Sequence, residues 1–228
     1  MFHTGIPTKI RCIKYGVKHK GSYFYVQRPY GVIYHSKANE LVEVICEEHQ
    51  YDSLNVKGRQ VVDIGADCGD SSIQFAYRGA KEVYSYEPNV SAIRALDMTL
   101  TANKYKNISQ YNEAVLGKAG YVSIDANAEA NRAGKLTNGS FRIKATTLNE
   151  IVDKHKIKDG VLKMDCEGYE YEIFDGATDK TLLAFNEMAI ELHKGAGKII
   201  DRLGHLGYAI EQKKAGKDKN MFVIFARR

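Results

Sequence analysis

The residues of clearest chemical interest form a turn rich in glycine and aspartate, within the segment VVDIGADCGDS at 61–71. Gly65 and Gly69 let the backbone turn tightly and approach a ligand with no Cβ in the way. Glu87 stands 22 residues after Gly65, at the end of the next apolar run. A carboxylate at that place can accept two hydrogen bonds from vicinal ribose hydroxyls. Turn, spacing and acid together predict a site for a cofactor that carries a nucleoside.

The acids of this turn decide between two classes of cofactor. Asp63, Asp67 and Asp70 would repel the pyrophosphate of a dinucleotide, and the G-x-G-x-x-G pattern of dinucleotide sites is absent from the sequence. The same carboxylates suit the ammonium and sulfonium charges of S-adenosylmethionine, which has no phosphate. The alternative is that these aspartates only form turns and cap helices in solvent. We favour the cofactor interpretation and expect S-adenosylmethionine.

A second group of polar residues follows two later apolar runs. Asp165 and Glu167 lie in MDCEG at 164–168, and His193 directly follows the run at 190–192. A hydroxyl acceptor benefits from a general base, which contributes roughly 10²–10⁴-fold to the rate. All three residues are candidates for this base, and we favour Asp165 or His193. Glu167 can instead accept backbone amides at the start of a helix, and His193 can be structural. Oxygen-rich sets of this kind also suit magnesium, but we expect no metal.

These residues need a fold that brings the ends of several strands together. From residue 60 onward the sequence pattern alternates between strands and helices, which predicts a mostly parallel sheet with helices on both faces. The predicted strands are 60–64, 82–86, 108–115, 121–125, 141–145, 160–164, 188–192, 208–212 and 221–225. The predicted helices are 39–49, 71–78, 89–103, 147–155, 169–174 and 196–206. Residues 1–39 are expected to form short antiparallel strands, and 126–140 a polar loop.

The charges are distributed unevenly along the 228 residues, a length suited to one substantial domain. The net charge is +5, yet residues 1–39 hold seven basic residues and no acid, and residues 213–228 hold six basic residues and one acid. Residues 40–212 therefore carry a net charge of −7, with 20 basic and 27 acidic residues. An acidic body suits a cationic cofactor, and the basic ends would favour an anionic acceptor.

Targeting and redox signals are weak in this chain. No apolar run approaches the roughly 18 residues that a membrane helix needs, and the first residues, MFHTGIPTKIRCIKYG, lack the apolar centre of a signal peptide. The four cysteines show no C-x-x-C spacing and no zinc pattern with histidine. We therefore expect a reduced cytoplasmic protein that has no contact with membranes.

The motifs in order resemble those of the FkbM family of class I S-adenosylmethionine-dependent methyltransferases. The similarity extends over about 48–212 and rests on Tyr51 with VVDIGADCGDSSIQFA at 61–76, YSYEPN at 84–89, LKMDCEGYE at 162–170 and IELH at 190–193. The resemblance implies a Rossmann-like, seven-stranded, mostly parallel sheet with a reversed final strand. We expect a small β-rich N-terminal extension with a helix over 1–50 and the methyltransferase domain over 51–228.

The resemblance also implies roles for individual residues. Residues Asp63, Gly65 and Gly69 would shape the methionine end of the cofactor site, and Ser71 would bind its carboxylate. Glu87 would hold the ribose. The full set expected to bind cofactor is Asp63, Gly65, Ala66, Asp67, Gly69, Ser71, Glu87, Pro88, Asn112, Glu113 and Ala114, the last three beside the adenine. Asp67 departs from the asparagine usual in the family and adds a charge beside the cofactor.

Two acceptors are compatible with these features. The resemblance implies methyl transfer to a hydroxyl on a sugar or another small hydroxylated molecule. The alternative is RNA, because seven basic residues alternate with aromatic ones in 1–39, as in surfaces that contact phosphates and stack on bases. Alternating aromatics in short strands are more often a packing face, and the N-P-P-[YF] tetrapeptide of enzymes that methylate amines on bases is absent. We therefore favour the small acceptor.

Overall fold

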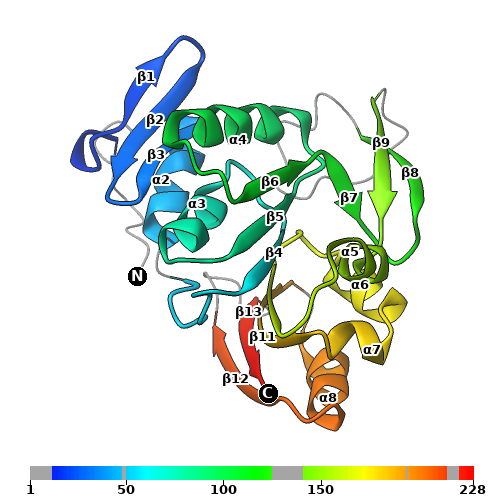
Figure 1. Cartoon of the computed structure of the whole chain (residues 1–228). Helices are drawn as coiled ribbons and strands as arrows, with labels where there is room; N and C mark the ends of the chain where they lie inside the picture. Colours follow the sequence, from blue (N-terminus) through cyan, green and yellow to red (C-terminus); the bar gives the residue numbers. More distant parts are fainter. Residues whose placement is uncertain (1–11, 48–49, 125–140, 194, 215–220) are drawn as a thin grey trace.

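A twisted sheet of seven strands forms the centre of the molecule (Figure 1). The computed structural model describes residues 12–47, 50–124, 141–193, 195–214 and 221–228. The sheet order is β12-β13-β11-β10-β4-β5-β6, and β13 alone runs antiparallel to β11 and β12. Its strands are β4 (Gln60–Ile64), β5 (Glu82–Tyr86), β6 (Ile108–Tyr111), β10 (Gly160–Met164), β11 (Phe185–Leu192), β12 (Ala209–Lys214) and β13 (Phe222–Arg227). The expected Rossmann-like sheet with one reversed strand is confirmed.

Both faces of the sheet are covered by helices, because the strands are apolar on both sides. Val61 packs with Phe75 of α3, whereas its neighbour Val62 packs with the opposite set of helices, since successive side chains point to opposite faces. Helices α3 (Asp70–Tyr77) and α4 (Val90–Asn103) lie on the first face. The second face is covered by α5 (Leu148–His155), α6 (Glu170–Gly176), α7 (Asp179–Leu182) and α8 (Gly197–His205). No helix among the described residues has the length and apolar character to cross a membrane.

The N-terminal region forms a separate antiparallel sheet that packs on α4 (Figure 1). It consists of β1 (Lys18–Lys20), β2 (Tyr23–Arg28) and β3 (Gly31–His35), followed by α2 (Ala38–Glu47). Asn103 fixes it by accepting the Val32 amide at 2.7 Å and donating to the Val32 carbonyl at 2.6 Å. The Tyr34 amide donates to Thr99 Oγ1 at 3.0 Å, and Ile33 is fully buried. The antiparallel strands expected here are confirmed, and two side chains at the end of α4 hold them to the domain.

A third sheet lies where the sequence predicts one continuous strand over 108–115. The structure divides this run at Asn112, and β7 (Glu113–Val115) leaves the central sheet to pair with β9 (Phe141–Thr146), which also pairs with β8 (Gly120–Ile124). The Asn112 side chain, between the two strands, donates through Nδ2 to the Glu87 and Pro88 carbonyls. Hydrophobic periodicity continues across the break, so the single strand was wrong. The short α7 was also not predicted, and the loop 126–140 lies outside the described residues.

Replacing Asn103 with alanine tests how the N-terminal sheet is held. The variant removes three hydrogen bonds, two to Val32 and one to the Thr99 carbonyl, and leaves backbone groups of Val32 without their partners. We expect the free energy of unfolding to fall by about 1–3 kcal/mol in urea denaturation. Asn55→Ala is the control, because this exposed side chain should contribute less than about 0.5 kcal/mol. Equal stability of the two variants would show that the sheet does not depend on Asn103.

Candidate active site

The site lies at the carboxyl ends of β4, β5, β10 and β11. Strand β4 is flanked by β5 on one side and by β10 on the other, so the chain reverses its direction of growth here. Open α/β sheets bind ligands at such a point, outside the carboxyl ends of the strands. The glycine turn, Glu87, Asp165 and His193 all follow these four strand ends. The fold therefore gathers the two groups of residues that the sequence singled out.

A buried ion pair lies directly under the glycine turn. Lys163 Nζ is 3.1 Å from Asp63 Oδ1, and both side chains are almost completely buried. Burial lowers the pKa of Lys163, but the nearby carboxylates of Asp63 and Asp165 raise it. The carboxylates outweigh burial, so the pKa of Lys163 lies above its ordinary value. The hydroxyls of Ser71 and Ser72 both donate to Asp63 Oδ2 at 2.7 Å. Asp63 and Ser71, two of the residues expected to bind cofactor, thus contact each other beneath the turn.

The same ammonium group also holds the turn itself. Lys163 Nζ donates to the Gly65 carbonyl at 2.5 Å. Gly65 has a φ of +75°, and a Cβ built there would lie 1.7 Å from the Asp165 carbonyl oxygen. Glycine is therefore required at this position, because the end of β10 passes directly against it. The close approach places Asp165 beside the glycine turn.

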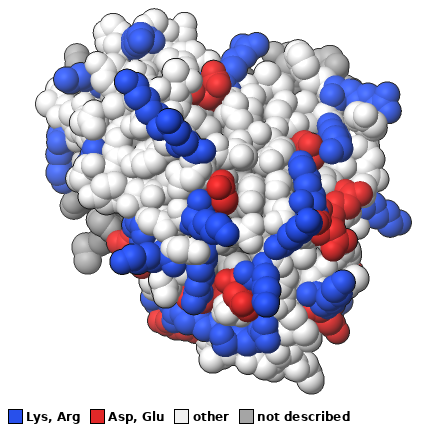
Figure 2. Space-filling view, in the orientation of Figure 1, with Lys and Arg blue, Asp and Glu red and all other residues white. Residues whose placement is uncertain are grey.

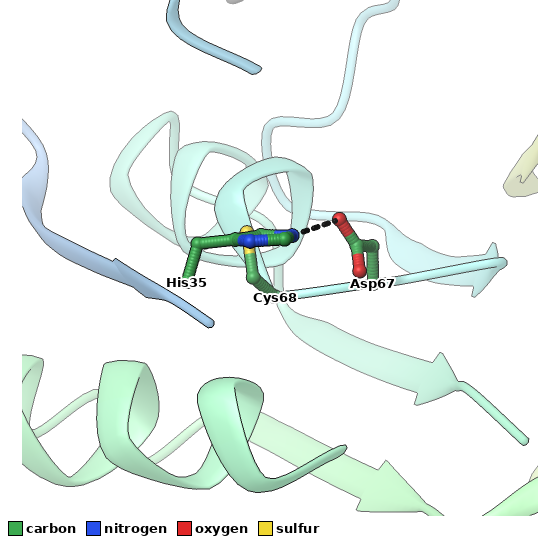
Figure 3. A group of neighbouring side chains, drawn as sticks. All are labelled: His35, Asp67 and Cys68. Carbon is green, nitrogen blue, oxygen red and sulfur yellow. Dashed lines mark ion pairs between the residues drawn. The ribbon is translucent and has the colours of Figure 1, made fainter. Parts of the chain in front are cut away.

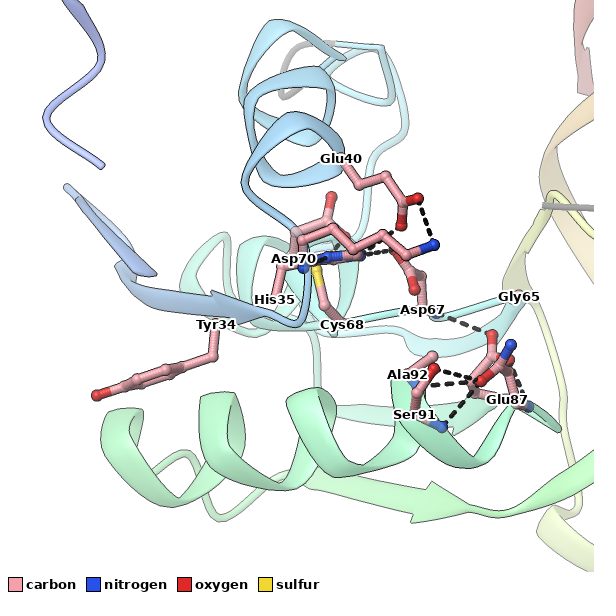
Figure 4. A network of polar contacts seen from close by, with 12 residues as sticks. Tyr34, His35, Glu40, Gly65, Asp67, Cys68, Asp70, Glu87, Ser91 and Ala92 are labelled. Atoms are coloured by element: carbon pink, nitrogen blue, oxygen red, sulfur yellow. Dashed lines mark hydrogen bonds and ion pairs between the residues drawn. The ribbon is translucent and has the colours of Figure 1, made fainter. Parts of the chain in front are cut away.

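Glu87 connects the turn to the end of β5. Its carboxylate accepts the Asp67 amide at 3.0 Å and the Asn89 amide at 2.8 Å (Figure 4). Burial and the nearby Asp67 raise the pKa of Glu87 to about 7. Burial also raises the pKa of Asp70 to about 7, although Lys163 lowers it in part. Burial and neighbouring carboxylates thus disfavour the charged forms of both groups, and a cationic ligand would stabilise those charged forms.

The residues expected beside the adenine divide between two elements. The Asn112 side chain binds the Glu87 and Pro88 carbonyls, whereas Glu113 and Ala114 belong to β7. Glu113 pairs with Lys144 at 3.0 Å, and Ala114 is buried among residues of the small sheet. Ala66, in the turn, is buried and donates its amide to the Tyr86 carbonyl. Pro88 and Asn112 therefore lie at the ends of β5 and β6, whereas Glu113 and Ala114 belong to the small third sheet.

The second group of polar residues surrounds one imidazole. His193 Nδ1 lies 3.2 Å from Glu170 Oε1, and Nε2 lies 3.5 Å from Glu167 Oε2 and 3.8 Å from Glu191 Oε1. Burial lowers the pKa of His193, but Glu170, Asp165 and Glu167 raise it to about 9 overall. The ring is therefore an imidazolium at neutral pH, because several carboxylates face a single cation.

The carboxylates of Glu167 and Glu170 make different contacts. Glu170, not Glu167, accepts the Cys166 and Gly168 amides, each at 3.1 Å, and so holds the turn after β10. Glu167 has a left-handed φ of 57°, and its Oε2 atom lies 3.5 Å from His193 Nε2. The amide-binding role considered for Glu167 is thus performed three residues later, by a side chain with no exposed surface.

Several residues of this group were not assigned a role from the sequence. Glu191 is buried, accepts a hydrogen bond from Gln50 Nε2 at 2.7 Å, and has its pKa raised to about 7 by burial and by Asp165. The Tyr51 hydroxyl donates to Asp165 Oδ2 at 3.5 Å. Glu191 lies in β11 two positions before His193, which directly follows that strand, and their side chains approach to 3.8 Å. The motifs LKMDCEGYE at 162–170 and IELH at 190–193 contain Glu170 and Glu191, so the family resemblance was a signal for both residues, whereas Gln50 carried none.

Two sets of side chains among the described residues have the spacing of metal ligands. Asp165, Glu170 and His193 each offer one ligand atom, as do His35, Asp67 and Cys68 (Figure 3), and within each set these atoms lie within 4.8 Å of one another. In the first set, carboxylates and imidazole are ligand types that divalent cations accept. In this structure the protonated ring of His193 supplies the positive charge among these carboxylates.

Comparison with known proteins agrees with this architecture. The chain is 24% identical over 196 residues to the hexuronic acid methyltransferase AglP of Haloferax volcanii, an alignment that covers 82% of this chain and 76% of that protein. The structure of M. jannaschii TYW2 in complex with AdoMet has a TM-score of 0.56 at 18% identity, covering 92% of this chain and 87% of that one. The structure of Trm5b from Pyrococcus abyssi has a TM-score of 0.53 at 14% identity, covering 90% of this chain and 55% of that one. These structural likenesses show the fold.

The family is shown by a separate match. Residues 63–210 match the methyltransferase FkbM domain, a span that contains the glycine turn, Glu87 and the residues around His193. With the reversed strand of the central sheet and the site at its switch point, the chain belongs to the FkbM family of methyltransferases.

Proposed function

We propose that this enzyme methylates a hydroxyl group of a sugar or of another small hydroxylated acceptor. The observation that carries the proposal is the group of carboxylates around His193, which lies at strand ends adjoining the cofactor turn. Such a group can receive the proton that a hydroxyl loses. Similarity to a hexuronic acid methyltransferase supports a sugar acceptor, and the basic N- and C-terminal segments would favour an anionic one.

S-adenosylmethionine is the methyl donor of this enzyme, and the residues present fit it. Glu87 has the acceptor atoms for two ribose hydroxyls at the end of the second strand. Asp67 lies in the turn and Asp70 at the start of α3, and a cationic ligand beside them would lower the pKa values of Asp70 and Glu87, which are both raised to about 7. The donor supplies an activated methyl group on a sulfonium, so this chain has to align, desolvate and deprotonate the acceptor.

The acidity of the surrounding groups suggests which residue takes the proton. Glu191, with a pKa of about 7, is well matched to a working pH near neutrality, and Asp165 lies close enough to raise that pKa. His193, with a pKa of about 9, holds a proton already and is poorly suited to accept another. We assign proton removal to Glu191 or Asp165, and to His193 the neutralisation of Glu167 and Glu170.

The RNA alternative has less support. Tyr15, Tyr23, Phe24 and Tyr30 pack against the buried core that includes Ile33, so these aromatic rings act as a packing face. Figure 2 shows Lys and Arg side chains interspersed with Asp and Glu on the visible face of the described residues. The likeness to TYW2 and Trm5b is a likeness of fold at low identity. RNA is therefore an outcome to be tested.

The acceptor class is tested by transfer of labelled methyl groups from S-adenosylmethionine to a hexuronic acid, to a neutral hexose and to total RNA. We expect label in the sugars, more of it in the acid, with moderate dependence on salt. Label confined to RNA, with activity that falls steeply as salt is added, would overturn the proposal.

Replacing Glu87 with alanine tests the cofactor assignment. Loss of a charge-assisted acceptor should weaken binding of S-adenosylmethionine by about 1.5–3 kcal/mol in calorimetric titration. Glu82→Ala is the matched control, because it removes the same side chain from the other end of β5. Unchanged affinity in the Glu87 variant would refute its role at the ribose.

Replacing Glu191 with glutamine tests the proton acceptor. Glu191 must be ionised to accept a proton, so the activity of the parent enzyme should rise with pH through about 7 and then level off. The variant should lose roughly 10²–10⁴-fold in kcat and the rise near pH 7, with affinity for S-adenosylmethionine within about twofold. Glu211→Gln, on the exposed strand β12, should retain both kcat and the pH profile. A Glu191→Gln variant with the parent's pH profile would transfer the role to Asp165.

A further inference from the structure

His35 lies against the cofactor turn, although 32 residues of sequence separate it from Asp67 (Figure 3). The ring stands at the end of β3 and is 4% exposed. Its Nε2 atom is 3.3 Å from Asp67 Oδ2 and 3.4 Å from Glu40 Oε2. A residue from outside the methyltransferase motifs therefore contacts the turn that those motifs define.

The hydrogen bonding of the ring fixes which nitrogen carries the proton. Nδ1 accepts the Lys37 amide at 3.0 Å, so this nitrogen has no hydrogen of its own. The proton of the neutral ring is then on Nε2, directed at Asp67 and Glu40. Neither nitrogen retains a lone pair for a metal ion, even though His35, Asp67 and Cys68 have the spacing of ligands. The arrangement is that of a hydrogen-bond donor to a carboxylate.

Asp67 contacts both His35 and Glu87, the residue proposed to bind the ribose of the cofactor. Its φ of 43° is left-handed, a conformation uncommon for residues other than glycine. Its side chain faces His35 while its amide donates to Glu87 Oε2 at 3.0 Å (Figure 4). One residue in a constrained conformation thus joins His35 on one side to Glu87 on the other.

The element that carries His35 is held independently of the turn. Val32 and Tyr34 are hydrogen-bonded to Asn103 and Thr99 of α4, and Ile33 is fully buried between them. His35 follows these residues directly, so its position is set by α4 and the small sheet. The ring can therefore act as a fixed anchor for the turn.

We infer that His35 is a positioning residue of the cofactor site. It holds the Asp67 carboxylate and, through it, the Asp67 amide that orients Glu87, so the N-terminal sheet takes part in binding S-adenosylmethionine. The aspartate at position 67 has a physical reason here, because a carboxylate accepts from Nε2–H more strongly than the amide of asparagine. The inference rests on the proposed role of Glu87 at the ribose.

Calorimetric titration of S-adenosylmethionine into His35 variants tests this inference. His35→Ala should raise Kd about tenfold, the effect of losing one charge-assisted hydrogen bond. His35→Gln places an amide donor near the position of Nε2 and should recover most of the affinity, whereas the shorter side chain of His35→Asn should not. His19→Ala is the control, because it removes an exposed histidine from β1 of the same sheet, and it should keep Kd within about twofold. Unfolding temperatures are measured for every variant.

A second background separates positioning from a general loss of stability. In an Asp67→Ala background, His35→Ala should change Kd by less than about twofold, because the carboxylate that it orients is gone. The inference is overturned if His35→Ala retains the parent Kd, or if its effect is the same in both backgrounds. If His35→Ala fails to fold, His35→Gln and His35→Asn are compared in both backgrounds with the same criteria.

Parallel titration of Glu87→Ala distinguishes the two levels of the argument. A parent protein that does not bind S-adenosylmethionine would refute the proposed function itself. Weak binding by Glu87→Ala with normal binding by His35→Ala would refute only the role of His35. Normal binding by Glu87→Ala would remove the basis of both assignments.

Discussion

The buried ion pair between Asp63 and Lys163 is the interaction on which the site depends. The two residues are direct neighbours on the parallel strands β4 and β10, where the chain has reversed its direction of growth. Loss of one partner of such a pair typically costs about 3–5 kcal/mol, because the other charge stays buried without compensation. Here the ammonium also binds the Gly65 carbonyl, and the carboxylate also binds Ser71 and Ser72. One pair of charges therefore fixes the turn, the start of α3 and the end of β10 together.

This constraint explains why the two polar groups lie side by side. Gly65 allows the Asp165 carbonyl to approach the turn, so the end of β10 emerges beside the residues of the glycine turn. The next strand, β11, runs parallel to β10 and delivers Glu191 and His193 to the same edge. The electrostatic character follows from that crowding: burial and neighbouring carboxylates raise the pKa of Glu191 to about 7, and several carboxylates hold His193 as an imidazolium. The pKa values of Glu191 and His193 are thus set by the neighbours that meet at this edge of the sheet in the folded domain.

The central fold could be predicted well from the sequence, and its exceptions have local causes. The strands at 60–64, 82–86 and 160–164 have the predicted bounds, because their apolar runs are short and end in turn residues. The run at 108–115 was divided by Asn112, whose side chain binds two carbonyls of another segment. Contacts between distant segments leave no trace in hydrophobic periodicity, so a break of this kind is not visible in one sequence.

The sequence by itself determined the class of sheet, and it predicted the cofactor turn with Glu87 and the candidate residues Asp165, Glu167 and His193. These features are local, since a strand, a glycine turn and an acid at a strand end depend on residues that are close along the chain. Only the tertiary structure decided that Asp63 pairs with Lys163, that Glu170 holds the turn after β10, and that His35 faces Asp67. Each of these contacts joins side chains on different elements, and burial together with neighbouring charge sets their protonation. Which side chains meet in these contacts depends on how the elements of the whole domain pack together.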